Sequence, residues 1–325
     1  MSDPHERANG PLFVVGPPRS GTKLLQSILN ASPDVSIGPE SHLFPKLLMN
    51  FGGLPLDGCW QEVLSILSRS NYLERLRRNG FEAELEPILQ NAPDLPGTIL
   101  SLLKEVARWQ GRSDAEWIGD KTPNYVRYTS LFRRYFPEAR FITIVRDPRD
   151  QALSVRRTWG KDPLLAAERW KKDLDALQEA SREAPSVHYK LRYEDLLEAP
   201  ENTIKGLCEY LNIPFDRTML GASSSEKFGS GKNMEGVLEG NQRKYFEGFR
   251  PERIRRIEAI CLPQLKEWGY PVHYADEAKG VGPVYRKVAE GANFLQNLRF
   301  NIKNRGLRRG LRYLIRIRRD KQDRG

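Results

Sequence analysis

The stretch that decides the fold reads FVVGPPRSGTKLL and spans residues 13–25. Its first three residues are aromatic or β-branched, which is typical of a buried strand. A turn from Gly16 to Gly21 follows, and its two glycines allow the left-handed backbone that points N–H groups inward. From Thr22 onward apolar residues recur at helical spacing, so a helix begins there with its positive end toward the turn. The strand, the turn and the helix N-terminus together predict an anion-binding site, most often for a phosphate.

The residues of the loop narrow the type of phosphate ligand. The loop of nucleoside triphosphatases reads G-x-x-x-x-G-K-[ST], with lysine directly after the second glycine. Here the glycine spacing is kept, but the order of the next two residues is Thr22-Lys23, and a cation, Arg19, stands inside the loop. This pattern favours a phosphate ligand other than a nucleoside triphosphate. A Gly/Pro turn with an incidental Arg-Ser-Gly-Thr is the alternative for the loop taken alone.

Composition limits the class of protein. The 325 residues suffice for one large α/β domain or two smaller ones. The three cysteines are far apart and odd in number, which predicts reduced thiols rather than disulfides or a zinc site. Residues 1–10 are polar, and no apolar run approaches the length that spans a bilayer. We therefore expect a cytoplasmic protein without a secretory signal.

The net charge of +10 is concentrated near the C-terminus. Residues 299–325 contain eleven Lys and Arg and two Asp and Glu, which leaves 41 positive and 40 negative residues elsewhere. The body is thus almost neutral, and this removes the main support for nucleic-acid binding. Read as a helix, residues 299–325 gather apolar side chains on one side and arginines on the other, as in a helix lying on anionic lipid. A solvated or self-packed basic helix and binding to RNA or an acidic polymer are the alternatives.

Strand and helix patterns alternate along the chain. Besides residues 13–15, strands are expected at residues 35–37, from 117, at 139–145 and at 187–192. Helices are expected at residues 22–30, 128–136, from about 151, 164–180, 201–211, 251–268 and from 284. Residues 43–110 form a mainly helical insertion over the C-terminal edge of the sheet, where they would shape an acceptor pocket. The alternation predicts an α/β fold with a P-loop-like, mostly parallel sheet and helices on both faces.

The same patterns suggest a division into domains. Residues 1–11 form a polar arm, 12–275 the main domain, and 276–325 a helical extension that ends in the basic tail. Residues 221–240 are rich in serine and glycine and predict a loop.

A second candidate anion site follows the strand at 139–145. The strand ends in Arg146, and Ser154 lies eight residues later, about two helical turns on. In a nucleotide hydrolase an acid at this place holds Mg²⁺, and Asp147 would be that acid. Yet Arg146 comes first and would repel a metal, whereas an arginine and a hydroxyl together suit a phosphate. The alternative is that Arg146 pairs with Asp147 or Asp150 and that Ser154 is an ordinary helix residue.

These motifs together resemble the sulfotransferase family, whose members use 3′-phosphoadenosine 5′-phosphosulfate (PAPS) as donor and release PAP. The resemblance covers residues 12 to about 270 and is closest to the bacterial, carbohydrate and tyrosylprotein branches. It is based on PRSGT at 18–22, GDKTP at 119–123, RDPRD at 146–150, YEDL at 193–196 and a lysine before an aromatic residue at 244–245. The chain departs from the cytosolic steroid and phenol branch at Leu24, where that branch has tryptophan. It also has Lys23 where threonine is usual, which adds positive charge near the 5′-phosphate.

The resemblance implies catalytic roles for four residues. Glu40 is expected to be the general base, and it follows a strand end where topology already places ligands. His42 is the fallback, because an imidazole titrates near neutrality. Arg19 and Lys121 are expected to stabilise charge on the leaving 5′-phosphate oxygen. A helix-entry carboxylate at Glu40 and a surface ion pair between Asp120 and Lys121 are the alternatives.

The resemblance also implies contacts to the donor. They are expected from Pro18, Arg19, Ser20, Gly21, Thr22 and Lys23 in the loop region, and from Arg146, Ser154, Tyr193 and Lys244. Arg146 and Ser154 match the pair that binds the 3′-phosphate in the family. No metal is expected, because sulfuryl transfer does not require one and no cluster of typical metal ligands stands out.

The sequence therefore favours a PAPS-dependent sulfotransferase that acts on a hydroxyl acceptor. A carbohydrate or glycolipid is the preferred acceptor, and a peptide tyrosine remains open. The first alternative is a nucleotide kinase or ATPase with an atypical phosphate loop. The second is an inactive protein of the same fold that binds a membrane surface. Both the sulfotransferase and the inactive binding protein could attach peripherally to an anionic membrane through residues 299–325.

Overall fold

The structure is a computed structural model that describes residues 10–221 and 241–306. The chain divides into two compact units, the first made of residues 1–146 and 173–241 and the second of residues 147–172 and 242–325. Most of the predicted arm, nearly all of the predicted loop 221–240 and the part of the basic tail beyond residue 306 lie outside the described residues.

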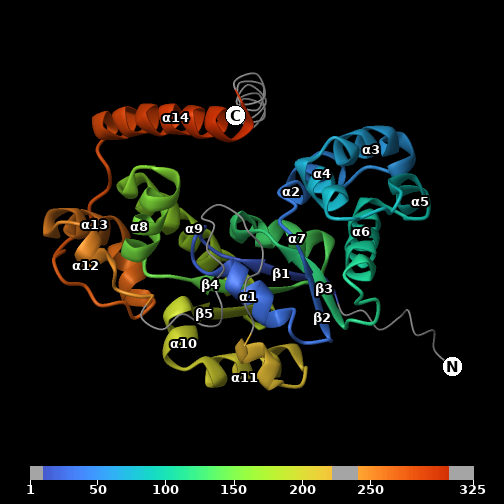
Figure 1. The fold of residues 1–325 in the computed structure, drawn as a ribbon, viewed down its shortest axis with the longest axis horizontal. Coiled ribbons are helices and arrows are strands. Elements are labelled where there is room, and N and C mark those ends of the chain that lie inside the picture. Colours follow the sequence, from blue (N-terminus) through green and yellow to red (C-terminus); the bar gives the residue numbers. More distant parts are fainter. Residues whose placement is uncertain (1–9, 222–240, 307–325) are drawn as a thin grey trace. The chain divides into compact units, whose positions relative to one another are not determined.

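The first unit is built on a five-stranded parallel sheet (Figure 1). Its strands are β1 (Leu12–Val15), β2 (Val35–Gly38), β3 (Trp117–Lys121), β4 (Arg140–Val145) and β5 (His188–Arg192). Their spatial order is β2-β3-β1-β4-β5, and Leu12 is level with Gly119 on one side and with Arg140 on the other. All of β1 is buried, as expected for the middle strand of a parallel sheet covered on both faces. The predicted α/β fold is confirmed.

The other elements of the first unit are short helices. They are α1 (Thr22–Leu29), α2 (Phe44–Phe51), η2 (Leu56–Gly58), α3 (Trp60–Ser68), α4 (Asn71–Arg78), α5 (Leu85–Gln90), α6 (Leu95–Trp109), η3 (Pro123–Tyr128), α7 (Thr129–Tyr135), η4 (Pro185–Val187), α10 (Tyr193–Glu198), α11 (Pro200–Leu211) and η5 (Arg217–Gly221). The second unit contains α8 (Pro148–Trp159), α12 (Tyr245–Gly248), α13 (Pro251–Glu267) and α14 (Pro283–Arg305). The helix α9 (Pro163–Glu183) begins in the second unit and ends in the first.

The alternation of side chains along β1 creates a core on each face of the sheet. On one face, the apolar residues of β1 pack with those of α1 and α11, and this cluster includes Leu12, Val14, Leu25, Ile28 and Leu207. On the other face, Phe13 stacks on Phe141 with ring centroids 5.6 Å apart. Phe13 also contacts Phe132 of α7, at 4.3 Å between centroids. Helices therefore cover both faces of the sheet.

The helical insertion predicted for residues 43–110 is present between β2 and β3, as α2 to α6. Its last helix packs closely on β2, which is an edge strand of the sheet. A Cβ atom at Gly38 would lie 3.1 Å from Cγ1 of Val106 in α6. The insertion thus lies directly beside the strand that precedes Glu40.

Arg149 holds the core of the second unit together. Its fully buried guanidinium donates to Asp147 Oδ2 and Glu258 Oε1, both at 2.6 Å, and to the carbonyl oxygen of Pro271 at 2.8 Å. Because charged groups are buried only when they are paired, this network fixes α8 against α13.

The structure departs from the sequence predictions at two helices: α8 begins earlier than predicted, and α10 is a helix that the sequence did not predict. α8 begins at Pro148, because Asp147 Oδ1 accepts a hydrogen bond from the backbone N–H of Arg149 at 2.9 Å. The residues after β5 form the first turn of α10, where Asp195 Oδ2 accepts from the backbone N–H of Arg192 at 3.2 Å. Among the helices of the described residues, none combines the length and the apolar character needed to cross a bilayer.

Candidate active site

Each of the five strands ends at a residue or loop that the sequence marks as a candidate for the site. β1 leads into the loop 16–21, Glu40 follows β2, and Lys121 ends β3. Arg146 follows β4, and Tyr193 follows β5. Because the carboxyl ends of parallel strands lie at one edge, the topology gathers these groups where open α/β sheets bind their ligands.

The loop between β1 and α1 has a backbone that glycine adopts most easily. The φ angles are 148° at Gly16, 72° at Arg19 and 99° at Gly21. A Cβ atom at Gly16 would also collide with the carbonyl oxygen of Ile144. A turn with several positive φ angles points successive N–H groups into a concave nest that binds anions. The two glycines are therefore required by the shape of this loop.

Ser20 fits a phosphate oxygen. Its side chain is fully buried, and its hydroxyl has no hydrogen-bond partner among the described residues. A buried hydroxyl without a partner costs about 1–3 kcal/mol, which a ligand oxygen would recover. Gly21 is the N-cap of α1 and supplies no side-chain cap, so the first N–H groups of this helix also face the loop. The loop thus fits the 5′-phosphate of the donor that the resemblance implies.

Arg146 adjoins the loop through the ring of Tyr193. The guanidinium carbon of Arg146 lies 4.6 Å from the centroid of this ring, and Nη2 donates to the carbonyl oxygen of Asn241 at 2.8 Å. The same ring lies against the loop, since a Cβ atom at Gly21 would be 2.5 Å from Tyr193 Cδ2. Burial, and then the charge of Arg146, lowers the pKa of Arg19, which still remains protonated. Two arginines so arranged favour a ligand with more than one negative charge.

Glu40 lies between two cationic or ionisable partners. Its Oε1 is 2.6 Å from Lys121 Nζ, and its Oε2 is 2.7 Å from His42 Nε2. Burial raises the pKa of Glu40, but the hydrogen bonds and charges of His42 and Lys121 outweigh it and bring the pKa to about 2. The backbone carbonyl of Glu40 accepts a hydrogen bond from Arg75 Nη2 of α4. The candidate base is therefore ionised and held at both its side chain and its backbone.

A buried polar cluster supports the segment that contains Glu40. Asp120 is fully buried, and its Oδ2 accepts from the backbone N–H of Ser41 at 3.0 Å. Ser41 Oγ lies 2.6 Å from the hydroxyl of Tyr125. Burial raises the pKa of Asp120 to about 6, although hydrogen bonds from Thr122 and Ser41 oppose this. Asp120 thus positions the residue next to Glu40, and the ion partner of Lys121 is Glu40 and not Asp120.

The predicted site residues are divided between the two units. Pro18 lies in the loop, and Thr22 and Lys23 begin α1, next to the residues described above. Ser154 lies within α8, and Lys244 directly precedes α12, both in the second unit. Their contacts to the donor stay predictions, as does the pairing of Ser154 with Arg146.

Both carboxylate oxygens of Asp147 are hydrogen-bonded to Arg149, which does not suit a metal ligand. Its Oδ1 accepts from Arg149 Nε at 2.9 Å, and its Oδ2 accepts from Arg149 Nη2 at 2.6 Å. A carboxylate with a bidentate guanidinium is a poor ligand for Mg²⁺, because both oxygens already face a cation. The hydrolase interpretation therefore loses its expected metal ligand.

Comparison with known proteins agrees with these motifs. A model of the sulfotransferase family matches residues 11–217, and the chain belongs to this family. A putative protein-tyrosine sulfotransferase of Caenorhabditis briggsae is 24% identical over 280 residues, which cover 80% of this chain and 88% of the relative. Protein-tyrosine sulfotransferase 1 of Rattus norvegicus is 28% identical over 281 residues, which cover 80% of this chain and 69% of the relative. The sulfotransferase domain of the Synechococcus PCC 7002 olefin synthase has a similar fold, with a TM-score of 0.57, 19% identity, and coverage of 84% of this chain and 99% of that domain.

The family membership confirms the resemblance seen in the sequence. The protein is a sulfotransferase, an enzyme that transfers a sulfuryl group to a hydroxyl acceptor. This conclusion favours the first sequence hypothesis over a kinase or ATPase and over an inactive binding protein.

Two contributors to the site are not recognised in the sequence. Arg75 lies in the insertion, 35 residues after Glu40, and nothing in its surroundings distinguishes it from the neighbouring arginines of α4. Asp120 is part of the GDKTP motif, but the sequence assigns it no role beyond an ion pair with Lys121. The available signal was the position of Asp120 between Gly119 and Lys121, in a short strand that is buried throughout.

Proposed function

We propose that the enzyme transfers the sulfuryl group of PAPS to the phenolic hydroxyl of a tyrosine in a peptide. The support for a tyrosyl acceptor comes from the relatives, which are named protein-tyrosine sulfotransferases. The sequence favoured a carbohydrate or glycolipid, and this acceptor class is the second candidate. The observation on which the proposal rests is the Glu40 carboxylate, fixed by Lys121 and His42 beside the anion-binding loop.

In this proposal the donor lies along the edge formed by the loop and Arg146. The N–H groups of the loop and the hydroxyl of Ser20 bind the 5′-phosphate, and Arg146 binds the 3′-phosphate. When bound, PAPS supplies an activated sulfuryl group on a phosphate leaving group. Arg19 and Lys121 stabilise the negative charge that develops on the leaving oxygen, a contribution of about 10²–10³-fold for each fixed donor.

Glu40 takes the proton of the acceptor hydroxyl as its oxygen attacks sulfur. General-base catalysis of this kind contributes about 10²–10⁴-fold. A carboxylate with a pKa near 2 is a weak base, so it is better matched to a phenol, with an ordinary pKa of about 10, than to a less acidic sugar hydroxyl. A donor oxygen that accepts the Lys121 hydrogen bond in place of Glu40 also raises the pKa of Glu40, because the carboxylate then loses a cation. The low pKa of Glu40 therefore supports a tyrosyl acceptor, and its rise on donor binding makes the carboxylate a stronger base during the reaction.

Transfer of labelled sulfate from PAPS tests the proposal. The purified full chain is offered tyrosine-containing peptides, the same peptides with phenylalanine in place of tyrosine, and a panel of carbohydrate acceptors. We expect label on the tyrosine peptides alone. Label on carbohydrates alone would favour the second candidate, and ATP turnover without sulfate transfer would contradict both.

A further inference from the structure

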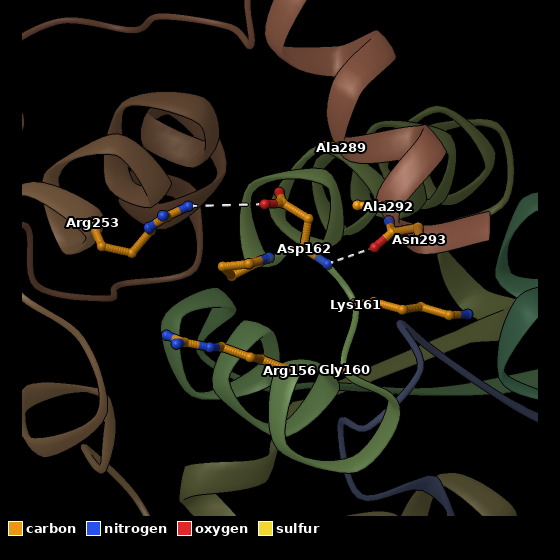
Figure 2. A pocket seen from close by; sticks show the side chains of 9 residues that line it. Arg156, Gly160, Lys161, Asp162, Arg253, Ala289, Ala292 and Asn293 are labelled. Atoms are coloured by element: carbon orange, nitrogen blue, oxygen red, sulfur yellow. Dashed lines mark hydrogen bonds and ion pairs between the residues drawn. The ribbon is translucent and has the colours of Figure 1, made fainter. Parts of the chain in front are cut away.

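α14 is fixed to the second unit through one of its faces. Asn293 Oδ1 accepts from the backbone N–H of Asp162 at 2.8 Å, and the hydroxyl of Tyr285 donates to Asp162 Oδ2 at 2.6 Å. Figure 2 shows Asn293 turned toward Asp162. Ala289, Ala292 and Asn293 line a cavity of about 260 Å³. Arg286 forms an ion pair with Glu168, with Nη2 and Oε1 2.6 Å apart. These contacts determine which side of α14 faces solvent.

The opposite side of α14 carries an exposed apolar stripe, which we define as Val284, Val288 and Leu295. Their exposed fractions are 76%, 69% and 54%, and Gly291 continues the same spacing between the second and the third. At about 100° per residue, these positions lie on one line along the helix, roughly opposite Asn293. Single exposed apolar residues are ordinary. Here, however, four of the eight large apolar residues that are exposed in the described part of the chain lie on this one helix, the fourth being Phe294.

Positive charge accompanies the stripe. Lys287 and Arg299 flank it on either side, about 60° away around the helix. Residues 283–325 contain thirteen Lys and Arg against three Asp and Glu, while residues 1–282 contain 39 of each sign. The entire net charge of +10 therefore belongs to α14 and the sequence that follows it.

This combination fits an anionic bilayer better than a second copy of the chain. In a two-helix seam the cations beside the stripe would face identical cations, and Gly291 would leave a gap where a knob is needed. At a bilayer, the apolar side chains enter the acyl region while the long stems of lysine and arginine reach the phosphates. Each basic residue near an anionic surface strengthens this attraction.

We propose that α14 is a membrane-binding helix, which lies in the interface of an anionic bilayer with the stripe toward the acyl chains. This inference does not depend on the acceptor or donor of the reaction. The sequence predicts lipid contact through residues 299–325. The proposed contact begins earlier, at Val284, within the part of the chain that the structure describes.

Vesicle sedimentation of the full chain tests the proposal. The vesicles are made of phosphatidylcholine, with or without phosphatidylserine. We expect binding only when phosphatidylserine is present, and weakening as salt screens the charges. The double variant Val288→Glu, Leu295→Glu should bind at least about tenfold more weakly, since it removes two buried apolar side chains and adds two anions. Both positions are exposed, so sulfate transfer should remain at the wild-type level.

A matched control places the same two charges elsewhere. Gln61 and Gln90 are exposed on α3 and α5, so Gln61→Glu, Gln90→Glu makes the same change in net charge far along the sequence from α14. It should retain most of the vesicle binding. The proposal is overturned if the wild type does not bind anionic vesicles, or if both double variants bind equally well. It is also overturned if the wild type is a dimer in solution that Val288→Glu, Leu295→Glu converts to a monomer.

Discussion

Lys121 Nζ lies 2.6 Å from Glu40 Oε1, and this contact joins the ends of two neighbouring strands. The Lys121 side chain is only 8% exposed, so its charge is poorly screened by water. The second carboxylate oxygen meets His42, and the pKa of Glu40 is accordingly about 2. The proposed base and one of the proposed leaving-group cations are thus one ion pair, and a change at Lys121 alters the pKa of Glu40.

Replacement of Lys121 by alanine is expected to act in two ways. It removes a cation from the leaving oxygen, which should lower kcat by about 10²–10³-fold. It also removes a cation from Glu40, so the pKa of Glu40 should rise, and the acid limb of the kcat/KM profile should move to higher pH. The pH dependence of kcat/KM for wild type and Lys121→Ala measures this shift. A slower variant with an unmoved acid limb would show that the pair does not set the protonation of the base.

Replacement of Glu40 by glutamine should lower kcat by about 10²–10⁴-fold with little change in PAP affinity, because the amide keeps the shape but cannot take a proton. His42→Gln is the matched control. It removes one hydrogen bond to Glu40 and should change kcat far less. Steady-state rates and PAP titration separate the two effects. A severe loss in His42→Gln with a near-normal Glu40→Gln would instead assign the base to His42.

Much of the fold could be predicted because local signals agree with one another. The run Phe13–Val15, the glycine turn and the helix after it each indicate the same strand–loop–helix unit, and their bounds in the structure differ from the predicted ones by a residue. The start of α8 was placed too late, since a side-chain cap by Asp147 depends on a single hydrogen bond that composition does not reveal. The order of strands in the sheet was not predicted, because pairing between distant segments leaves no local pattern.

Ser20→Ala should weaken donor binding without loss of stability. The hydroxyl is buried and has no partner among the described residues, so its removal relieves an unmade hydrogen bond in the protein alone. With PAP bound, the wild type should gain a hydrogen bond to a charged oxygen that the variant lacks, a difference of about 10- to 100-fold in Kd. Calorimetric titration with PAP and urea unfolding without it give both quantities. Weaker stability with unchanged PAP affinity would mean that Ser20 has a structural role.

Arg146→Ala should raise the Kd of PAP by at least about tenfold, because the arginine fork is the proposed ligand of the 3′-phosphate. Arg146→Lys is the informative control. It keeps the charge but not the fork, and should recover only part of the affinity. Adenosine 5′-phosphosulfate, which lacks the 3′-phosphate, should bind wild type and Arg146→Ala about equally. If Arg146→Ala weakens the binding of both ligands to the same extent, the arginine does not bind the 3′-phosphate.

The parts of the site that the sequence missed depend on burial and on contacts between distant segments. The Asp120-Lys121 dipeptide resembles a surface ion pair in sequence, but the alternation of a strand sends these two neighbours to different sides. Lys121 therefore meets Glu40, and Asp120 faces Ser41. Arg75 reaches Glu40 only because α4 folds back over the end of β2, which no spacing along the chain reveals.

Asp120 makes the stability of the protein depend on pH in a direction opposite to that of most carboxyl groups. Its pKa is about 6 in the folded chain, because burial disfavours the charged form, and an ordinary aspartate has a pKa of about 3.9 when the chain is unfolded. The folded state thus binds the proton more tightly, so the contribution of Asp120 to stability is fully present below about pH 4. It is lost as the pH rises through about 6. A shift of about two pKa units corresponds to roughly 2–3 kcal/mol.

Asp120→Asn tests this sign, because the amide oxygen can still accept from the Ser41 N–H but never ionises. Between about pH 4 and 7, we expect the free energy of unfolding of the variant to rise by roughly 2–3 kcal/mol relative to that of the wild type. Urea unfolding at several pH values measures the difference, and Asp57→Asn, at an exposed aspartate, is the control that should show no such gain. Parallel curves for wild type and Asp120→Asn would show that Asp120 is ionised in the folded protein throughout this range. In that case the buried cluster under Glu40 stabilises the carboxylate, and the Ser41 N–H donates to a charged oxygen.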